Sequence, residues 1–417
     1  DLKVYEEVLD NGLTVYLSKV PRYSIHARLT TLFGGSILEF KKEGEKYYTK
    51  VPAGVAHFLE HKLFDKKDYE PLVTFENNGA SANAFTNEFI TSYHFTSASL
   101  FEENLSMLLR FVHDPYFTDE NVLKEKGIIS QEKKEDMDNN YSILYDRSLV
   151  NIFHNLDFKN TVLGSLNDIN SITKDDLYKC YNAFYHPSNM ILSISGDIDI
   201  DKTMNLIKSF YGNHDFGEAK KITIKKKKEP ITVVKERDII LKDTKAIELY
   251  ISYKIKKPSK IKDKYLNKLY FSTLIDMKFS GLSEIADIAS NDKNILSSIS
   301  SRVVEVGDYY IVSFIVTVKD DTESVIKLID DNLKDMKFDE KRFNLIKKAV
   351  LNSLILSLEN PYEICSMIVN QKRMYGKLLT DIHTKILNLD FNTFKDFISS
   401  ADFSNRSITI LKPKKTS

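Results

Sequence analysis

The second half of this 417-residue chain repeats the order of sequence features in the first half. Residues 174–197 read KDDLYKCYNAFYHPSNMILSISGD, and residues 391–413 read FNTFKDFISSADFSNRSITILKP. In both stretches a helical pattern is followed by an aromatic residue, a Ser-Asn pair and an apolar strand. A duplication constrains the fold, because two copies of one pattern form two copies of one domain. We therefore expect two homologous domains of about 200 residues, within the usual size range.

A change in composition near the middle of the chain marks the limit between the expected domains. Residues 215–230 read DFGEAKKITIKKKKEP, a lysine run and a proline that are typical of a solvated linker. We therefore assign residues 1–213 to the first domain, 214–230 to the linker and 231–417 to the second domain. The strand-like opening of the first domain, with a predicted hairpin turn at Asp10-Asn11-Gly12, is echoed at residues 231–255.

Charge, hydropathy and cysteine content exclude several classes of protein. Lys and Arg number 59 and so do Asp and Glu, so the overall charge predicts neither a nucleic-acid nor an anionic membrane partner. No apolar stretch has the length of a membrane span. Cys180 and Cys365 are the two cysteines, too few for a disulfide framework or a thiolate zinc site. Together with an acidic start unlike a signal peptide, they predict a cytoplasmic protein with two buried structural thiols.

One short motif in the first half has the spacing of a metal site. His57 and His61 are four residues apart, so on a helix both imidazoles lie on one face, and Glu60 borders that face. Two imidazoles, a carboxylate and an open position make a catalytic zinc site, in which a nearby carboxylate accepts a proton from water. The alternative is a plain amphipathic helix that carries these polar residues on its surface.

A zinc site also needs a third protein ligand, which the downstream stretch KEKGIISQEKKED can provide. Glu125 and Glu132 are seven residues apart, almost two helical turns, and therefore share a face. Glu135 and Asp136 remain rivals, because helical periodicity alone does not separate them from Glu132.

The stretches VPAGVAHFLEHKLF, GASANAFT, EKGIISQE and FYHPSNM together resemble the insulinase/pitrilysin family of zinc peptidases. The resemblance is closest to bacterial YmfH-like members and to mitochondrial processing peptidase subunits. It implies an α+β fold of two homologous domains, each a mostly antiparallel sheet packed with helices. It also implies one Zn²⁺ per chain.

The resemblance implies a role for each matching residue. His57, His61 and Glu132 would bind the zinc ion, Glu60 would be the general base, and Glu125 would support the site from behind. The Asn83-Ala84-Phe85 segment would form an edge strand that binds an extended peptide by β-augmentation. An ordinary half-buried strand is the alternative interpretation of that segment.

The second half departs from the family pattern at one place. Many active relatives have an Arg and, seven residues later, a Tyr that help to hold the substrate. The corresponding stretch here, FSGLSEIADIASNDKNILSS, contains neither, although Arg302 and Tyr309 have the same spacing in the next strand-like run. The family also implies a chamber closed by two chains, so we expect a homodimer or a heterodimer with a relative that lacks the zinc motif.

These observations favour a zinc endopeptidase that hydrolyses short or unfolded peptides. The alternative function is a non-catalytic or structural subunit that pairs with a related peptidase. A phosphoesterase is disfavoured, because the chain has no glycine-rich phosphate loop and no carboxylate-rich two-metal motif.

Overall fold

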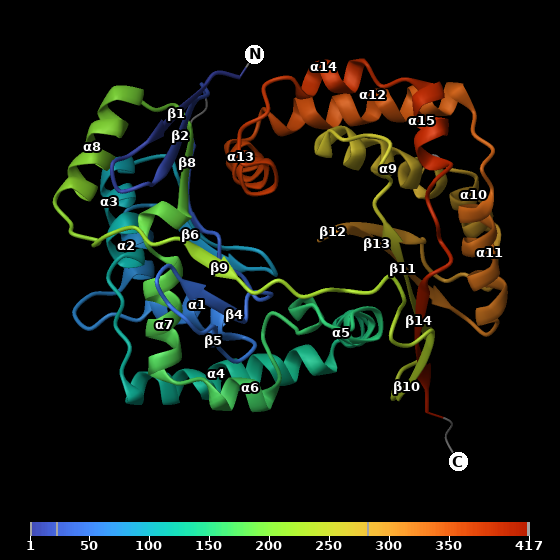
Figure 1. Cartoon of the computed structure of the whole chain (residues 1–417), viewed down its shortest axis with the longest axis horizontal. Helices are drawn as coiled ribbons and strands as arrows, with labels where there is room; N and C mark the ends of the chain where they lie inside the picture. The colour runs from blue at the N-terminus through green and yellow to red at the C-terminus, as the bar shows by residue number, and fades with distance from the viewer. Residues whose placement is uncertain (1, 22–23, 282, 415–417) are drawn as a thin grey trace. The chain divides into compact units, whose positions relative to one another are not determined.

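The structure is a computed structural model that describes residues 2–21, 24–281 and 283–414 (Figure 1). The chain forms two compact units that are each assembled from three segments. Both units have an α+β fold with a mostly antiparallel sheet, which confirms the predicted fold class. Unit 1 comprises Asp1–Glu135, Asn160–Lys226 and Ile355–Leu378, and unit 2 comprises Asp136–Lys159, Lys227–Leu354 and Leu379–Ser417.

Unit 1 contains the first half's strands together with one helix from the second half of the chain. Its strands are β1 (Val4–Val8), β2 (Thr14–Lys19), β3 (Ile25–Thr31), β4 (Glu39–Lys42), β5 (Thr49–Lys50), β6 (Ala80–Thr86), β7 (Thr91–Ser97), β8 (Met190–Gly196) and β9 (Ile222–Ile224). Its helices are α1 (Val55–Phe64), α2 (Pro71–Asn77), α3 (Phe101–Val112), α4 (Asp119–Asp138), α6 (Leu166–Ser171), α7 (Lys174–Phe184), η2 (Pro187–Asn189), α8 (Ile200–Gly212) and α13 (Pro361–Tyr375).

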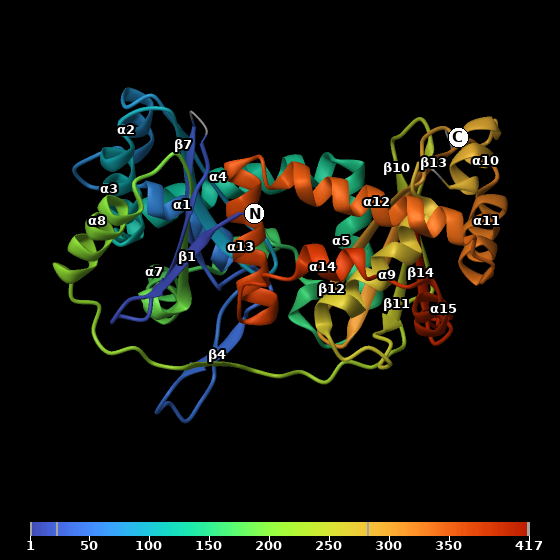
Figure 2. The same ribbon diagram turned by 90° about the horizontal axis from the view of Figure 1, so that it is seen from above.

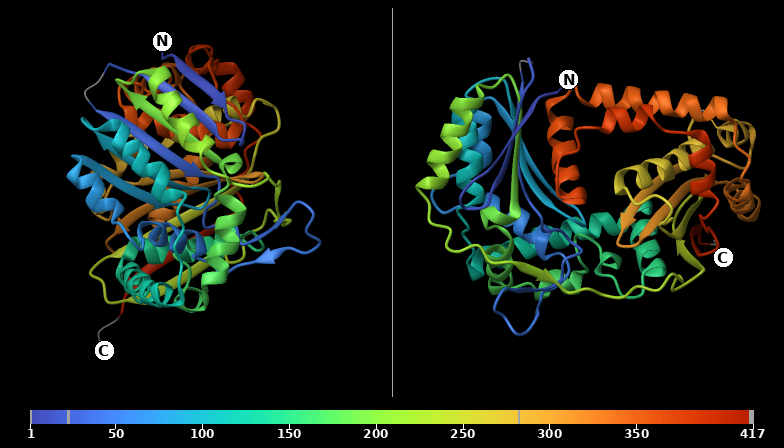
Figure 3. Two further views of the ribbon diagram at one scale, coloured as in Figure 1. Left: turned by 90° about the vertical axis from the view of Figure 1, so that its left-hand side faces the viewer. Right: turned by 45° about the horizontal axis from the view of Figure 1, so that its top comes forward.

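The main sheet of unit 1 has six strands in the order β1-β2-β8-β3-β7-β6. Its β2–β8 pair is parallel and its other pairs are antiparallel. One face carries the apolar residues of alternate positions, such as Leu17, Leu29 and Phe95, and forms the main core with the helices packed on it. Helix α13 lies on the other face, against β8 and β3, and Figures 1 and 3 show the sheet between α13 and the helices α3 and α8.

Strands β4 and β9 pair in a small separate sheet with β5, in the order β5-β4-β9. Figure 2 shows the β4–β5 hairpin reaching out from the main sheet of unit 1. Strand β9 lies within the stretch 214–230 that composition assigns to a linker, so part of that stretch pairs in a sheet.

Unit 2 is built in the same way around a five-stranded sheet in the order β10-β14-β11-β13-β12. Its strands are β10 (Arg237–Lys242), β11 (Ile247–Lys256), β12 (Ser300–Val306), β13 (Tyr309–Val318) and β14 (Arg406–Pro413). Its helices are α5 (Asn140–Ile152), η1 (Asp157–Lys159), α9 (Lys264–Phe279), α10 (Glu284–Asn291), α11 (Thr322–Lys334), α12 (Glu340–Ser357), α14 (Ile382–Leu387) and α15 (Phe391–Ile398).

The two sheets repeat one topology, β2-β8-β3-β7-β6 in unit 1 and β10-β14-β11-β13-β12 in unit 2. The first pair is parallel in each sheet and the following three pairs are antiparallel. Helix α5 packs on β14 and β11 as α13 packs on β8 and β3. Each of these helices comes from the half of the chain that supplies the other unit's sheet. The two compact units are therefore not continuous stretches of the chain. The domain limits 1–213 and 231–417 describe the repeat in the sequence and stay a prediction.

Two further findings concern cysteines and membrane spans. Cys180 and Cys365 are both buried free thiols. Within the described residues, helices that combine the length and the apolar character of a membrane span are absent.

Candidate metal centre

Helix α1 presents the two histidines of the motif toward helix α4. It begins after Gly54, whose φ of 87° lies in the left-handed region and where a Cβ would come within 2.3 Å of the Leu163 carbonyl oxygen. Glycine is therefore required at this helix start. The apolar positions of α1, such as Phe58 and Leu59, are buried in the core of unit 1, which fixes the rotation of the helix.

One ligand atom from each of His57, His61 and Glu132 lies within 4.8 Å of the other two. The His57 Nε2 atom is 3.7 Å from Glu132 Oε1, and the His61 Nε2 atom is 3.6 Å from Glu132 Oε2. These distances are too long for good hydrogen bonds. Tetrahedral ligands of a zinc ion, each about 2.1 Å from the metal, are about 3.4 Å apart. The donor set and its spacing therefore fit a zinc ion.

Glu125 supports the site from behind His61. Its Oε1 atom accepts a hydrogen bond from His61 Nδ1 at 3.0 Å, which leaves His61 Nε2 free for a metal. Its Oε2 atom lies 3.9 Å from the buried Lys62 ammonium, which donates to the Asn121 carbonyl oxygen at 3.3 Å and pairs with Asp65. Sequence reasoning missed Lys62, whose only signal is its place next to His61.

Glu60 is buried beside the histidines, with 8% of its surface exposed. Its Oε2 atom accepts a hydrogen bond from Thr86 Oγ1 at 2.6 Å, at the end of β6. Burial raises the pKa of the Glu60 carboxyl, against the lowering effect of the Thr86 hydrogen bond. Sequence reasoning missed Thr86 as well, although it directly follows the segment Asn83-Ala84-Phe85.

The two histidines differ in their protonation. Burial, with His61 nearby, lowers the pKa of His57 to about 3, so this imidazole is neutral near pH 7. For His61, burial acts to lower the pKa, but the hydrogen bond and charge of Glu125 outweigh it and the pKa is raised. A neutral His57 is the form that binds a metal.

The segment Asn83-Ala84-Phe85 lies in β6, the last strand of the main sheet of unit 1. Beyond β7, β6 pairs with no other strand of this sheet among the described residues. Asn83 is exposed, and its Oδ1 atom accepts a hydrogen bond from the Ala84 backbone N–H at 2.8 Å. This edge has the form that β-augmentation requires.

The other residues that the sequence singled out lie elsewhere. The Glu135 carboxylate accepts a hydrogen bond from Gln131 at 3.2 Å, and neither Glu135 nor Asp136 belongs to the three-residue metal group. Within unit 2, Arg302 lies over the Tyr145 ring at 5.2 Å, and Tyr309 donates to the Glu229 carbonyl oxygen at 2.7 Å.

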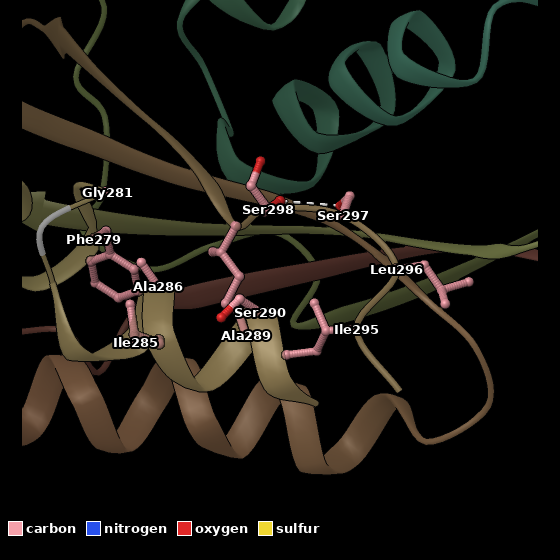
Figure 4. Close-up of a pocket in the computed structure, with 11 residues that line it drawn as sticks. Phe279, Gly281, Ile285, Ala286, Ala289, Ser290, Ile295, Leu296, Ser297 and Ser298 are labelled. Carbon is pink, nitrogen blue, oxygen red and sulfur yellow. Dashed lines mark hydrogen bonds between the residues drawn. The ribbon is translucent and has the colours of Figure 1, made fainter. Parts of the chain in front are cut away.

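Unit 2 also has a pocket of about 410 Å³ between α10 and the segment 295–299 (Figure 4). It lies in the stretch where the family resemblance places the missing Arg and Tyr. Its described lining is apolar with serines, as Phe279, Ile285 and Ser297 illustrate, and includes no His, Cys, Asp or Glu. It therefore provides no second set of metal ligands or catalytic acids.

Solved structures share this fold over the whole chain. A structure of an M16-like peptidase from Alicyclobacillus acidocaldarius matches with a TM-score of 0.93 at 23% identity, over 99% of both chains. A structure of a protease from Helicobacter pylori matches with a TM-score of 0.86 at 20% identity, over 99% of this chain and 100% of the other. The fold is therefore that of M16-type peptidase chains.

Two family models match most of the sequence. The model described as insulinase (peptidase family M16) matches residues 42–165, which include the histidine motif and Glu132. The model described as peptidase M16 inactive domain matches residues 171–350. The chain belongs to the M16 (insulinase) peptidase family, as its residue motifs predict.

Curated relatives carry names of the same family. A zinc protease of Bacillus subtilis, YmfH, is 37% identical over 278 residues, which are 66% of this chain and 65% of the relative. The beta subunit of the mitochondrial-processing peptidase of Caenorhabditis elegans is 23% identical over 385 residues, 86% of this chain and 80% of the relative. The match to the zinc protease of Rickettsia felis covers 50% of that protein. The chain thus spans between half and two thirds of the first two bacterial relatives that it matches.

Proposed function

We propose that this chain is a zinc-dependent endopeptidase that hydrolyses short or unfolded peptides. The observation that carries the proposal is the convergence of His57, His61 and Glu132 at zinc-ligand spacing, with the buried Glu60 beside them. Family membership and relatives named zinc proteases support the choice of metal and reaction.

His57, His61 and Glu132 are the proposed zinc ligands. A zinc ion in such a site acts as a Lewis acid toward a peptide carbonyl and lowers the pKa of a bound water. Glu125 holds His61 in the tautomer that presents Nε2, and Lys62 in turn lies beside Glu125. Mutation of such supporting groups typically weakens metal binding about 10- to 100-fold.

Glu60 is the proposed general base, which accepts a proton from water and then delivers it to the leaving amine. Its raised pKa suits the role of proton carrier, because a carboxyl group with a raised pKa holds the accepted proton more readily until the leaving amine takes it. The Thr86 hydroxyl fixes one carboxylate oxygen and leaves the other for the proton transfer.

The free edge of β6 is the proposed docking strand for the peptide. Main-chain hydrogen bonds along the free edge of the segment Asn83-Ala84-Phe85 would align an extended substrate regardless of its side chains. The Asn83 side chain occupies the Ala84 N–H in this structure, so it has to move aside where a peptide pairs at this N–H. Thr86 lies at the end of this strand and donates a hydrogen bond to Glu60, so the strand that aligns the peptide also positions the proposed general base.

A second chain of the family, identical or related, is the proposed partner that completes an enclosed chamber. The support is the name of the mitochondrial-processing peptidase beta subunit, which describes one subunit of a larger enzyme. A cytoplasmic location and the absence of nucleic-acid and membrane partners remain predictions from composition.

The test is the substitution Glu60→Gln. The amide keeps the size of the side chain and cannot accept the proton, so we expect unchanged zinc content and a loss of cleavage of at least about 100-fold. Zinc is measured on the purified protein, and cleavage with a quenched peptide library, with the chain alone and with any co-purifying subunit. Unchanged turnover in the variant would contradict the proposed role of Glu60.

The alternative, a non-catalytic or structural subunit, gives a different result in the same experiment. It predicts no cleavage by the wild-type chain, alone or with its partner, even when zinc is bound. The name of the family model that matches residues 171–350, an inactive domain, is the observation that keeps this alternative open.

A further inference from the structure

Two rows of polar residues cross the face of the unit 1 sheet that α13 covers, beside apolar residues such as Tyr16 and Ile191, and these rows form the polar face of the sheet. Strand register places the residues in rows, because directly paired residues share a face of the sheet. One row is Ser193–Arg28–His94–Asn83, and the next is Ser195–His26–Thr96–Ser81. The first row ends at Asn83 on the free edge of β6. The polar face is therefore continuous from the middle of the sheet to the proposed docking strand.

This face holds a cluster of buried polar atoms that lack a hydrogen-bond partner among the described residues. They are Ser18 Oγ, His26 Nε2, Arg28 Nε, Arg28 Nη2, Ser193 Oγ and Ser195 Oγ. Buried polar groups in proteins are normally satisfied, so such a cluster on one face calls for a specific explanation.

Arg28 is the central residue of this cluster. It is 2% exposed and has no carboxylate in ion-pair contact among the described residues. Its guanidinium carbon lies 4.5 Å from the centre of the Tyr362 ring of α13 and 5.4 Å from that of Phe85 in β6. A buried charge without a counter-charge is costly, and the aromatic rings offset only part of that cost.

The two histidines beside Arg28 are uncharged. Burial, followed by the nearby Arg28, lowers the pKa of His26 to about 2 and that of His94 to about 4. Both imidazoles are therefore neutral near pH 7 and offer hydrogen bonds. The cluster presents one permanent positive charge, a forked donor and neutral hydrogen-bonding groups.

Unit 2 provides an internal comparison, because its sheet also has a buried cation on the face that its α5 helix covers. Lys254 there is fully buried and donates to Glu229 at 2.6 Å and to the Ile152 carbonyl oxygen at 3.1 Å. The same architecture thus satisfies a buried cation with a carboxylate in one unit and leaves Arg28 without one in the other.

We propose that Arg28, with His26 and His94, forms a carboxylate-binding subsite for the peptide substrate. Arginine binds a carboxylate through two parallel hydrogen bonds, and Arg28 has Nε and Nη2 on one side of its fork without a partner. The carboxylate is an acidic side chain or the free C-terminus of the peptide. This inference rests on the proposed function, because it names a feature of the peptide that the enzyme selects.

The register also fixes which part of the peptide reaches the subsite. A peptide added to the edge of β6 lies three strand spacings from β3, about 14 Å away. The gap to the charged group is shorter than this backbone spacing, because the Arg28 side chain extends toward β6 and its guanidinium carbon lies 5.4 Å from the centre of the Phe85 ring. The carboxylate therefore belongs to a part of the peptide that lies next to the half-buried Phe85 and His94, at the β6 end of the polar row.

The experiment uses a cleaved neutral peptide into which one carboxylate is introduced at a time. Gln→Glu changes along the sequence test acidic side chains, and exchange of a C-terminal amide for the acid tests the terminus. Values of kcat/KM are compared for the full-length wild type, Arg28→Gln and the control Arg110→Gln. Arg110 lies on α3 and stacks on Tyr69 at 4.0 Å, so the control removes one positive charge of unit 1 away from the polar face.

We expect one carboxylate position to raise kcat/KM about ten-fold in the wild type and in Arg110→Gln, and not in Arg28→Gln. Cleavage of the neutral peptide should be the same in the wild type and in Arg110→Gln. Because Arg28→Gln removes an unpaired buried charge, its melting temperature should not fall. Should it fail to fold, Arg28→Lys keeps the charge without the fork and should show a reduced preference.

A second measurement separates this inference from the proposed function. Binding of the same labelled peptides to the full-length Glu60→Gln protein, with and without Arg28→Gln, is followed by fluorescence anisotropy. Arg28-dependent binding of the acidic peptide without any cleavage by the wild type would support the subsite and overturn the peptidase. Cleavage and binding without an Arg28-dependent carboxylate preference would overturn the subsite and leave the peptidase in place.

Discussion

At the scale of single residues, the candidate site depends on groups whose properties are set by their neighbours. His57 is neutral because it is buried, and His61 presents Nε2 because Glu125 holds its Nδ1 atom. Glu125, Lys62 and Thr86 surround the motif and fix the side chains of the candidate site.

The choice of third ligand gives a residue-scale prediction. We expect Glu132→Ala to lose stoichiometric zinc, because only two protein ligands remain. Glu135→Ala should keep zinc, because the Glu135 carboxylate contacts Gln131 and lies outside the metal group. Zinc content after dialysis, measured by atomic emission, checks both variants. Loss of zinc from Glu135→Ala with retention in Glu132→Ala would reverse the assignment.

Helix geometry determines which residues of the candidate site the sequence can predict. The spacing of His57 and His61 predicts their common face, because i and i+4 positions always meet on a helix. The seven-residue spacing of Glu125 and Glu132 predicts a shared face as well, but not which carboxylate faces the histidines. That choice depends on how α4 packs against α1, a long-range contact that local patterns do not encode.

At the scale of elements, the order of the sequence does not show where helices α13 and α5 pack. Each follows a long charged or amphipathic helix in its own half and packs on the sheet that the other half builds. Helix α13 covers Tyr16 and Ile191 of the unit 1 sheet with Ile364, Ile368 and Val369.

The packing of α13 predicts a stability effect. Ile368 is fully buried, so Ile368→Ala should lower the free energy of unfolding by about 2–5 kcal/mol. Ile355→Ala is the matched control, because Ile355 also lies in a helix but is 48% exposed, and its effect should stay within about 0.5 kcal/mol. Urea unfolding followed by circular dichroism measures both. Equal effects of the two substitutions would mean that α13 does not pack as described.

At the scale of the whole molecule, both compact units contain segments from both halves of the chain. Residues 136–159 precede the unit 1 strand β8 in sequence and belong to unit 2, while residues 355–378 belong to unit 1. Neither half of the chain therefore carries all the elements of one unit.

This exchange predicts the behaviour of a cleaved chain. A protease site inserted between Glu218 and Ala219, in the exposed run before β9, splits the chain into an α5-containing and an α13-containing fragment. We expect the two fragments to elute together at the volume of the intact protein, because each unit needs both. Size-exclusion chromatography of the nicked protein, with a denatured sample as control, provides the measurement. Separation of the fragments under native conditions would contradict the exchange.

The sequence by itself determined the duplication and the histidine motif, because these depend on local periodicity and short spacings, and its resemblance to a known family implied the α+β class. Tertiary structure alone decided that α5 and α13 exchange units, that Thr86 holds Glu60 and that Arg28 is buried without a carboxylate. These features arise from contacts between residues far apart in the chain, whose geometry is set by strand register and helix packing. No pattern within a single helix or strand specifies them.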